Sequence, residues 1–311
     1  MNGFLRDMTW VMLGAVVLFN TGCATTDFVT GSSVNNMYSI EEEVQLGREF
    51  HKEVLSEFRK SKTPINRDPV RFELLEDMVS NIAAVAHIKT IPYKVTYVGD
   101  PEIVNAFAFP GGQMMVFEGL WDEDEGLVET VDELAAVVGH EIAHVNCRHS
   151  TEAMTRELVP NLLLAGGLMW AEIEDEEDLQ LIFGGAMLVY DGLLVTKYSR
   201  EDEHEADVVG MMYMAQAGYN PEAAPRIWER LASGGESQLD KAFSIFSTHP
   251  RDKRRAEELQ KHLPAAMALY EAAPVKRDGT RRVADLHAPG KKKKPKGSFE
   301  NADVLLEPSA D

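Results

Sequence analysis

Apolar residues recur at helical spacing along most of this chain. Ser39-Ile40-Glu41-Glu42 has the pattern of a capping box, and apolar residues follow it at near-helical intervals up to Leu55. The same spacing predicts further helices at about 68–87, 130–148, 200–217, 221–233 and 251–271. The predicted domain is therefore mainly helical.

The period changes to that of strands in one region only. Tyr93 to Val98 predicts a strand, and residues 106–109 and 113–117 predict two more, joined by Pro110-Gly111-Gly112 as the turn of a hairpin at 105–117. We expect this small sheet beside the helix at 130–148, which makes the fold class α+β. Strand 113–117 is either an ordinary hairpin strand or an exposed edge that binds an extended substrate by strand addition.

The ends of the chain predict segments outside the domain. An apolar run from Met8 to Phe19 is too short for a comfortable membrane span, and Thr21-Gly22-Cys23 follows it. We therefore expect a lipoprotein signal peptide at 1–22 and lipidation of Cys23, with Ala24 favouring outer-membrane sorting; an ordinary signal peptide or an uncleaved anchor is the alternative. The remaining predicted segments are a tether at 23–38, one domain at 39–271 and a disordered charged tail at 272–311.

Composition narrows the class of function. The 311 residues include 51 acidic and 31 basic side chains, for a formal net charge of −20. Such a charge argues against binding to nucleic acid or to an anionic membrane surface.

Two apolar patches within 161–195 are separated by acidic residues, so we expect buried or cleft-lining helices there rather than membrane spans. Two cysteines imply no disulfide framework.

The clearest chemical motif is His140-Glu141-Ile142-Ala143-His144. Residues four apart share a helix face, so both imidazoles can reach one metal ion, and Glu141 can take a proton from bound water. The alternative is a pair of polar residues on a solvated helix. Since the surrounding helix is apolar, it would bury unpaired histidines at a cost, which favours the metal site.

A catalytic zinc needs a third protein ligand and an open fourth position. The acidic stretch from Tyr198 to Asp207 is a candidate source, because Glu203 and Asp207 are four residues apart and share a helix face. One of the two can bind metal while the other accepts the second N–H group of a ligating histidine. Spacing alone does not choose Glu203 over Glu201, and a solvated charged face is the plainer interpretation.

Two residues that follow the HExxH motif are weaker candidates. His149 falls off the ligand face, and Cys147 is interpreted as a small buried residue.

The motifs together resemble the CAAX-protease/HtpX-like family of gluzincin zinc metallopeptidases. The resemblance covers roughly residues 39–260, and its motifs are, in order, Glu43 with Gly47, the stretch 105–112, the stretch 132–137 leading into HExxH, the S-R-x-x-E-x-x-A-D pattern at 199–207, and Thr248-His249-Pro250 with Arg255. It implies a mainly helical zincin-type domain that holds one zinc ion per chain. Thr21-Gly22-Cys23 resembles a bacterial lipobox, the short motif that precedes a lipidated cysteine. Together with the absence of multiple spans, it resembles the periplasmic lipoprotein branch (LoiP/BepA type), without the tetratricopeptide array.

The resemblance also implies roles for individual residues. His140, His144 and Glu203 would hold zinc, Asp207 would orient His140, and Glu141 would be the general base. His249 and Arg255 are candidate donors to the oxyanion; alternatively His249 occupies the open zinc position and keeps the enzyme latent. The expected substrates are unfolded or misassembled envelope proteins, and the expected location is the bacterial periplasm, at a membrane reached through the lipid anchor. A chaperone-like or latent zinc-binding lipoprotein is the alternative function.

Overall fold

The computed structural model describes residues 24–26, 29, 31, 33–121, 126–156, 198–233, 249 and 254–286. The predicted signal peptide with Cys23, the apolar patches of 161–195 and residues 287–311 lie outside these ranges. Among the described helices, none combines the length and the apolar character that crossing a membrane requires. The described part is mainly helical with a small sheet, which confirms the predicted α+β class.

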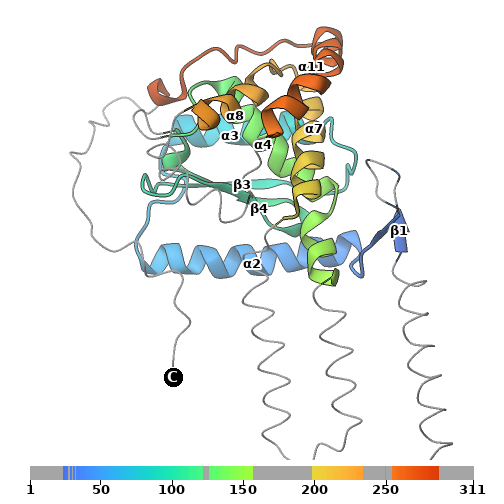
Figure 1. Cartoon of the computed structure of the whole chain (residues 1–311). Coiled ribbons are helices and arrows are strands. Elements are labelled where there is room, and N and C mark those ends of the chain that lie inside the picture. The colour runs from blue at the N-terminus through green and yellow to red at the C-terminus, as the bar shows by residue number, and fades with distance from the viewer. Residues whose placement is uncertain are drawn as a thin grey trace, which may run out of the picture.

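A three-stranded sheet lies between one long helix and a group of shorter ones (Figure 1). Helix α2 (Ile40–Lys60) runs along one face of the sheet, and its N-terminus is closed by the predicted capping box of Ser39 and Glu42. The other face carries the remaining helices: α3 (Pro69–Ala83), α4 (Val131–Asn146), α7 (Arg200–Gln216), α8 (Ala223–Ser233) and α11 (Arg255–Ala272). Each of them coincides with a range that the apolar spacing predicts, and only α11 runs past its range, by one residue.

The sheet has the order β3-β5-β4. Strand β5 (Gln113–Phe117) pairs in parallel with β3 (Lys94–Val98) and antiparallel with β4 (Ala106–Ala108), and the Pro110–Gly112 turn joins β4 to β5 as predicted. The expectation of an exposed substrate-binding edge at 113–117 is therefore wrong, because β5 is the central strand and every one of its residues is buried. The two edge strands of the sheet are β3 and β4.

The two faces of β5 belong to two cores. Met114 and Val116 pack into the large core under α3, α4 and α7, whereas Met115 and Phe117 pack with Phe50 of α2. A strand that is buried on both faces carries an unbroken apolar run, so its sequence lacks the alternation that marks a half-exposed strand. This explains why the sequence pattern could not distinguish a central strand from an edge.

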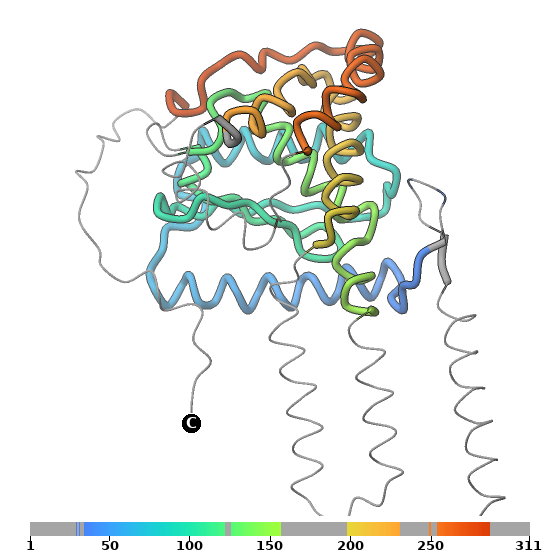
Figure 2. Tube along the Cα trace, in the orientation of Figure 1, coloured from blue at the N-terminus to red at the C-terminus, as the bar shows by residue number. Residues whose placement is uncertain are grey.

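Helices α4 and α7 lie side by side (Figure 2). Two glycines, one on each helix, let their backbones approach closely. A Cβ atom on Gly139 would lie 2.7 Å from the Gly210 carbonyl oxygen, and one on Gly210 would lie 2.6 Å from the His140 backbone nitrogen. Contacts this short exclude any side chain at either position. The crossing brings the first turns of α7 alongside the middle of α4.

Residues after α11 continue over the domain as a C-terminal strap, residues 273–286. Its carbonyl oxygens accept hydrogen bonds from Val131 and Asp132 at the start of α4, and Val283 is 1% exposed. The folded domain thus extends past the predicted boundary at 271, and the first part of the predicted disordered tail belongs to it. Sequence composition missed it because few apolar side chains anchor the strap, and its attachment is largely through backbone groups.

The predicted tether is likewise partly attached. Strands β1 (Ala24–Thr26) and β2 (Ser33–Asn35) form an antiparallel pair, and Asn36 is 3% exposed. Asn36 Nδ2 donates a hydrogen bond to Thr151 Oγ1 at 2.8 Å and another to Glu43 Oε1 at 3.3 Å. Residues 36–38 therefore contact the domain, and the tether is shorter than predicted.

Candidate metal centre

Three elements bring the predicted ligands together. Helix α4 presents His140 and His144 on one face, α7 contributes Glu203 from its first turn, and His249 comes from the segment before α11. One ligand atom from each of the four residues lies within 4.8 Å of all the others. Three of these side chains are nearly fully buried, and His140 is partly exposed.

The separations fit a tetrahedral metal. His140 Nε2 and His144 Nε2 lie 3.0 Å apart, and oxygens of Glu203 lie 3.5 Å from each. Ligands about 2.0–2.1 Å from a tetrahedral zinc are separated by about 3.3 Å. Glu203 Oε2 is buried, and no donor among the described residues is aligned with it, although Arg255 Nη1 lies 2.6 Å away. Two imidazoles and a carboxylate are also the ligand set of a catalytic zinc site.

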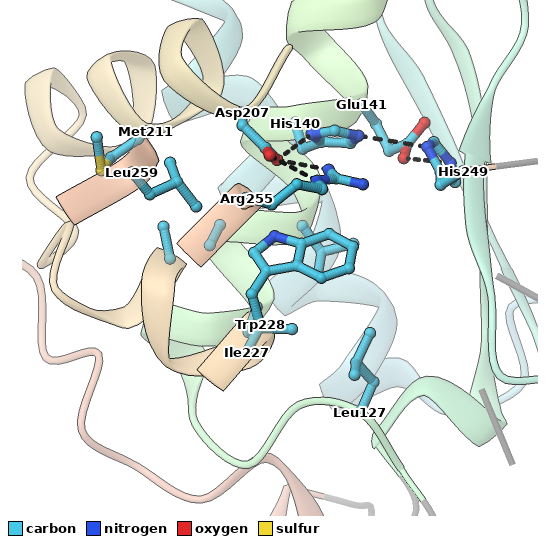
Figure 3. A pocket seen from close by; sticks show the side chains of 13 residues that line it. Leu127, His140, Glu141, Asp207, Met211, Ile227, Trp228, His249, Arg255 and Leu259 are labelled. Carbon is cyan, nitrogen blue, oxygen red and sulfur yellow. Dashed lines mark hydrogen bonds and ion pairs between the residues drawn. The ribbon is translucent and has the colours of Figure 1, made fainter. Parts of the chain in front are cut away.

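Charged groups outside the ligand set hold two of the ligands, and Figure 3 shows Asp207 and Arg255 beside His140. Asp207 Oδ1 lies 3.1 Å from His140 Nδ1, at the position where a carboxylate would orient a metal-binding imidazole. Arg255 donates two hydrogen bonds of 2.6 Å to Asp207, and its third nitrogen faces Glu203. The guanidinium also lies 3.7 Å from the Trp228 ring centroid. Because all its nitrogens face carboxylates, Arg255 positions Glu203 and Asp207, and the expected role as oxyanion donor does not fit this geometry.

Glu141 is fixed beside the ligand pair. The backbone N–H of Ala108, on the edge strand β4, donates a 2.9 Å hydrogen bond to Glu141 Oε2. The other oxygen, Oε1, lies 3.4 Å from His249 Nε2. The carboxylate is thus held by one oxygen, and its second oxygen faces the centre of the cluster, as a base acting on metal-bound water requires.

His249 lies within the ligand cluster. Its Nδ1 atom is 2.9 Å from Glu203 Oε1 and 3.3 Å from His140 Nε2. A donor atom at this position can serve as a fourth ligand, which would close the site. The arrangement therefore favours the latent role of His249, as an occupant of the open zinc position, over its role as an oxyanion donor.

His149 contacts a predicted metal ligand, although its sequence spacing places it off the ligand face. Its Nδ1 atom lies 2.8 Å from His144 Nδ1, and its Nε2 atom lies 3.1 Å from Glu205 Oε2. If Nε2 of His144 binds metal, its Nδ1 carries the proton and donates to His149 Nδ1. The second nitrogen of His149 then donates to Glu205, so the pair fixes the tautomer of His144.

Tyr198 is a second residue that the sequence did not reveal. Its ring stacks on His144 at 3.8 Å between centroids with planes 17° apart, and its hydroxyl lies 2.9 Å from Ser150 Oγ. This stacking holds His144 from the side that the hydrogen bond to His149 leaves open. Neither His149 nor Tyr198 belongs to a metal-binding spacing in the sequence. Their contacts with His144 become visible only in the structure, where the segments after α4 and before α7 pack together.

The charges of the cluster suit a cation. Burial raises the pKa of Glu203, but His249 and Arg255 outweigh burial and hold that pKa well below its usual range, so Glu203 is a carboxylate. Burial lowers the pKa of His144, which keeps its imidazole neutral. Burial also lowers the pKa of His140, yet Asp207 and Glu203 outweigh it and raise the pKa to about 9. Metal binding at His140 therefore releases a proton.

Comparison with known proteins also indicates a metallopeptidase. Residues 69–263 match the model of peptidase family M48. The mitochondrial metalloendopeptidase OMA1 of Schizosaccharomyces pombe is 33% identical over 240 residues, which cover 76% of this chain and 66% of the relative. The putative beta-barrel assembly-enhancing protease of Vibrio cholerae is 30% identical over 200 residues (63% and 40%), and its Escherichia coli K12 counterpart is 24% identical over 229 residues (72% and 44%).

The chain thus spans between 40% and 66% of the length of these curated relatives. The matches include mitochondrial and bacterial proteases alike, so they support the family and not one branch of it. The lipoprotein branch stays a prediction. The match covers every ligand of the cluster, and zinc is the metal on which this family depends. The chain therefore belongs to peptidase family M48, and residues 69–263 contain its zinc metallopeptidase site.

Proposed function

We propose that this chain is a zinc endopeptidase that hydrolyses peptide bonds in misfolded or misassembled proteins of the cell envelope. The observation that carries the proposal is the placement of Glu141, which a purely structural zinc site does not need. Its carboxylate is 2% exposed, hydrogen-bonded through one oxygen and directed with the other at the ligand cluster. Burial raises the pKa of Glu141, which makes it a stronger base.

The chain's own residues divide the work of catalysis. A zinc ion held at this site would supply Lewis-acid activation of a water molecule and of the scissile carbonyl. Glu141 takes the proton of that water and later delivers it to the leaving amine. His140, His144 and Glu203 would hold the metal. Asp207 and His149 would orient the two histidines, and Arg255 orients Glu203 and Asp207.

The substrate class and the location rest on sequence and on the relatives. A lipidated Cys23 would attach the chain to the periplasmic face of a bacterial membrane, with Ala24 favouring the outer one. The names of two bacterial relatives, beta-barrel assembly-enhancing proteases, support envelope proteins as substrates. A net charge of −20 is consistent with protein substrates and argues against nucleic acid as a partner.

The test compares the wild-type chain with Glu141→Gln on casein and on unfolded proteins. Since the substitution keeps the shape of the side chain and removes the base, turnover should fall about 10²- to 10⁴-fold. Metal analysis should find one zinc per chain in both proteins. Equal hydrolysis by both proteins would show that Glu141 is not the base and would contradict the proposed mechanism.

The position of His249 favours a second candidate, a latent or chaperone-like zinc protein. With His249 Nδ1 as a fourth ligand, no open position would remain for water. His249→Ala should then raise turnover severalfold while zinc is retained. A fall in turnover with zinc retained would instead support His249 as an oxyanion donor, and unchanged turnover would contradict both roles.

A further inference from the structure

A buried ion pair joins the first turn of α2 to the turn that follows α4 (Figure 1). The Glu43 carboxylate is 1% exposed, and Arg148 Nε donates a 2.8 Å hydrogen bond to its Oε1 atom. The same oxygen accepts hydrogen bonds from Thr151 Oγ1 at 2.6 Å and from Asn36 Nδ2 at 3.3 Å. A charge buried this deeply is costly unless it is paired and hydrogen-bonded. These donors, which all lie outside the metal cluster, therefore hold Glu43 in one position.

Arg148 has a backbone conformation that needs support. Its φ of 61° lies in the left-handed region, which is unfavourable for a residue with a Cβ atom. Such a conformation persists only where the surrounding structure imposes it. The Arg148 side chain is 5% exposed, and its guanidinium donates hydrogen bonds to Glu43 and to the backbone carbonyl of Tyr38. Both contacts hold the turn through the arginine side chain.

The turn places His149 against a metal ligand. His149 directly follows Arg148, and its Nδ1 atom lies 2.8 Å from His144 Nδ1. A return of Arg148 to a right-handed conformation would redirect the chain and move His149 away from His144. A series of contacts therefore leads from Glu43 through Arg148 and His149 to His144.

We propose that Glu43 is a positioning residue of the metal site, which acts through Arg148 and His149 to orient His144. This gives a role to the first motif of the chain, which the metal cluster itself does not use. The inference goes beyond the proposed function, because it concerns the geometry of the metal ligands and not the substrate.

The segment before α2 takes part in the same support. Asn36 Nδ2 donates to Thr151 Oγ1 at 2.8 Å, and the backbone N–H of Met37 donates to Thr155 Oγ1 at 3.1 Å. Asn36 is also one of the donors to Glu43. Asn36→Ala should therefore weaken zinc binding in the same direction as a change at Glu43.

The first test measures zinc affinity of the full-length chain by chelator competition. Glu43→Gln keeps the shape of the side chain and leaves Arg148 without its ionic partner. Its zinc dissociation constant should rise roughly tenfold, at the lower end of the range for groups that contact a ligand directly. Glu41→Gln makes the same change at an exposed position of α2 and should bind zinc like the wild type. Unchanged affinity in Glu43→Gln would overturn the proposal.

A second comparison separates positioning from general loss of stability. Phe50→Leu alters the apolar core beneath α2 and should lower the melting temperature, but it should leave the zinc dissociation constant unchanged. If Phe50→Leu weakened zinc binding as much as Glu43→Gln, the effect would be a general loosening of α2, and the proposal would fail.

A double-mutant cycle tests the route from Glu43 to the metal. If Glu43 acts through His149, adding Glu43→Gln to His149→Ala should change the zinc dissociation constant by less than about twofold. Full additivity of the two losses would overturn the route.

Arg148→Gly supplies a rescue, because glycine adopts the left-handed conformation without strain. The double variant Glu43→Gln/Arg148→Gly also leaves no buried charge unpaired, and it should recover most of the affinity that Glu43→Gln loses. A double variant that binds zinc as weakly as Glu43→Gln would show that the turn is not held in this way and would overturn the proposal.

Discussion

At the scale of single residues, the metal site divides into a part that sequence spacing predicts and a part that it does not. His140, Glu141 and His144 form a local motif, because residues four apart on a helix share a face. Glu203 required the family resemblance, since spacing alone does not choose it over Glu201. The structure brings Glu203 to both histidines and turns Glu205 toward His149.

His149 shows why spacing was insufficient. Five residues after His144, it would lie off the ligand face if α4 continued. The helix instead ends at Asn146 with Cys147 as its C-cap, and Arg148 has a φ of 61°, a left-handed conformation that redirects the chain. The turn brings His149 back onto His144 at 2.8 Å. A helical wheel drawn from sequence cannot contain this reversal, because it assumes an uninterrupted helix.

The His149 hydrogen bond should contribute to metal affinity. His149→Ala removes the acceptor for His144 Nδ1–H, so the zinc dissociation constant, measured by chelator competition, should rise about 10- to 100-fold. His149→Gln, which retains a hydrogen-bonding group, should recover part of the loss. His204→Ala, at an exposed position of α7, is the matched control and should bind zinc like the wild type. Unaltered zinc affinity in His149→Ala would show that the contact is only packing.

At the scale of elements, the site depends on how closely two helices approach. Neither α4 nor α7 alone holds a metal, since the histidines lie on one and Glu203 on the other. The crossing at Gly139 and Gly210 sets the distance between them. A comparable glycine, Gly47, lets α2 pass the Pro110–Gly112 turn, where a Cβ atom would lie 1.8 Å from the Pro110 carbonyl oxygen. Glycines in these helices therefore have packing roles that their low helix propensity conceals.

Widening the α4–α7 crossing should weaken the metal site. In Gly210→Ala the new methyl group meets the backbone of Gly139 and His140, so α7 must shift and carry Glu203 away from the histidines. We expect a loss of about 1–3 kcal/mol in unfolding free energy together with weaker zinc binding, both measured on the purified chain. Glu201→Ala, exposed on the same helix, controls for a general effect of changing α7. Normal zinc affinity in Gly210→Ala would show that the crossing has room to adjust.

At the scale of the whole molecule, the helices and the hairpin turn were predictable, but several boundaries and pairings were not. Local periodicity indicates each helix, because the apolar stripe of a helix is written in neighbouring residues. Periodicity does not show that β3 pairs with β5 in parallel, nor that the strap at 273–286 returns to α4. Both contacts join residues distant in sequence through backbone hydrogen bonds, which leave little trace in side-chain composition.

The strap completes the N-terminus of the helix that carries the zinc ligands. The first N–H groups of a helix have no partner within it. In α4 the side chain of Thr130 accepts from Glu133, while the strap carbonyls of Arg281 and Gly279 accept from Val131 and Asp132. Arg71 donates to the Leu286 carbonyl at 2.7 Å and so fastens the far end of the strap. The strap therefore supports the active helix from outside the segment that carries the family match.

Removing the strap should destabilise the domain without removing any metal ligand. A chain that ends at Ala273 loses the partners of two α4 N–H groups and the burial of Val283, together about 2 kcal/mol or more. We expect the melting temperature to fall by roughly 5 °C, since a domain of this size loses about 2–4 °C per kcal/mol. A chain that ends at Leu286 keeps every strap contact and should melt like the full-length protein, which makes it the matched control. Equal melting temperatures for the two shortened chains would mean that the strap is not a stabilising part of the domain. A lower melting temperature in the chain that ends at Ala273 alone would place the end of the folded domain beyond Ala273.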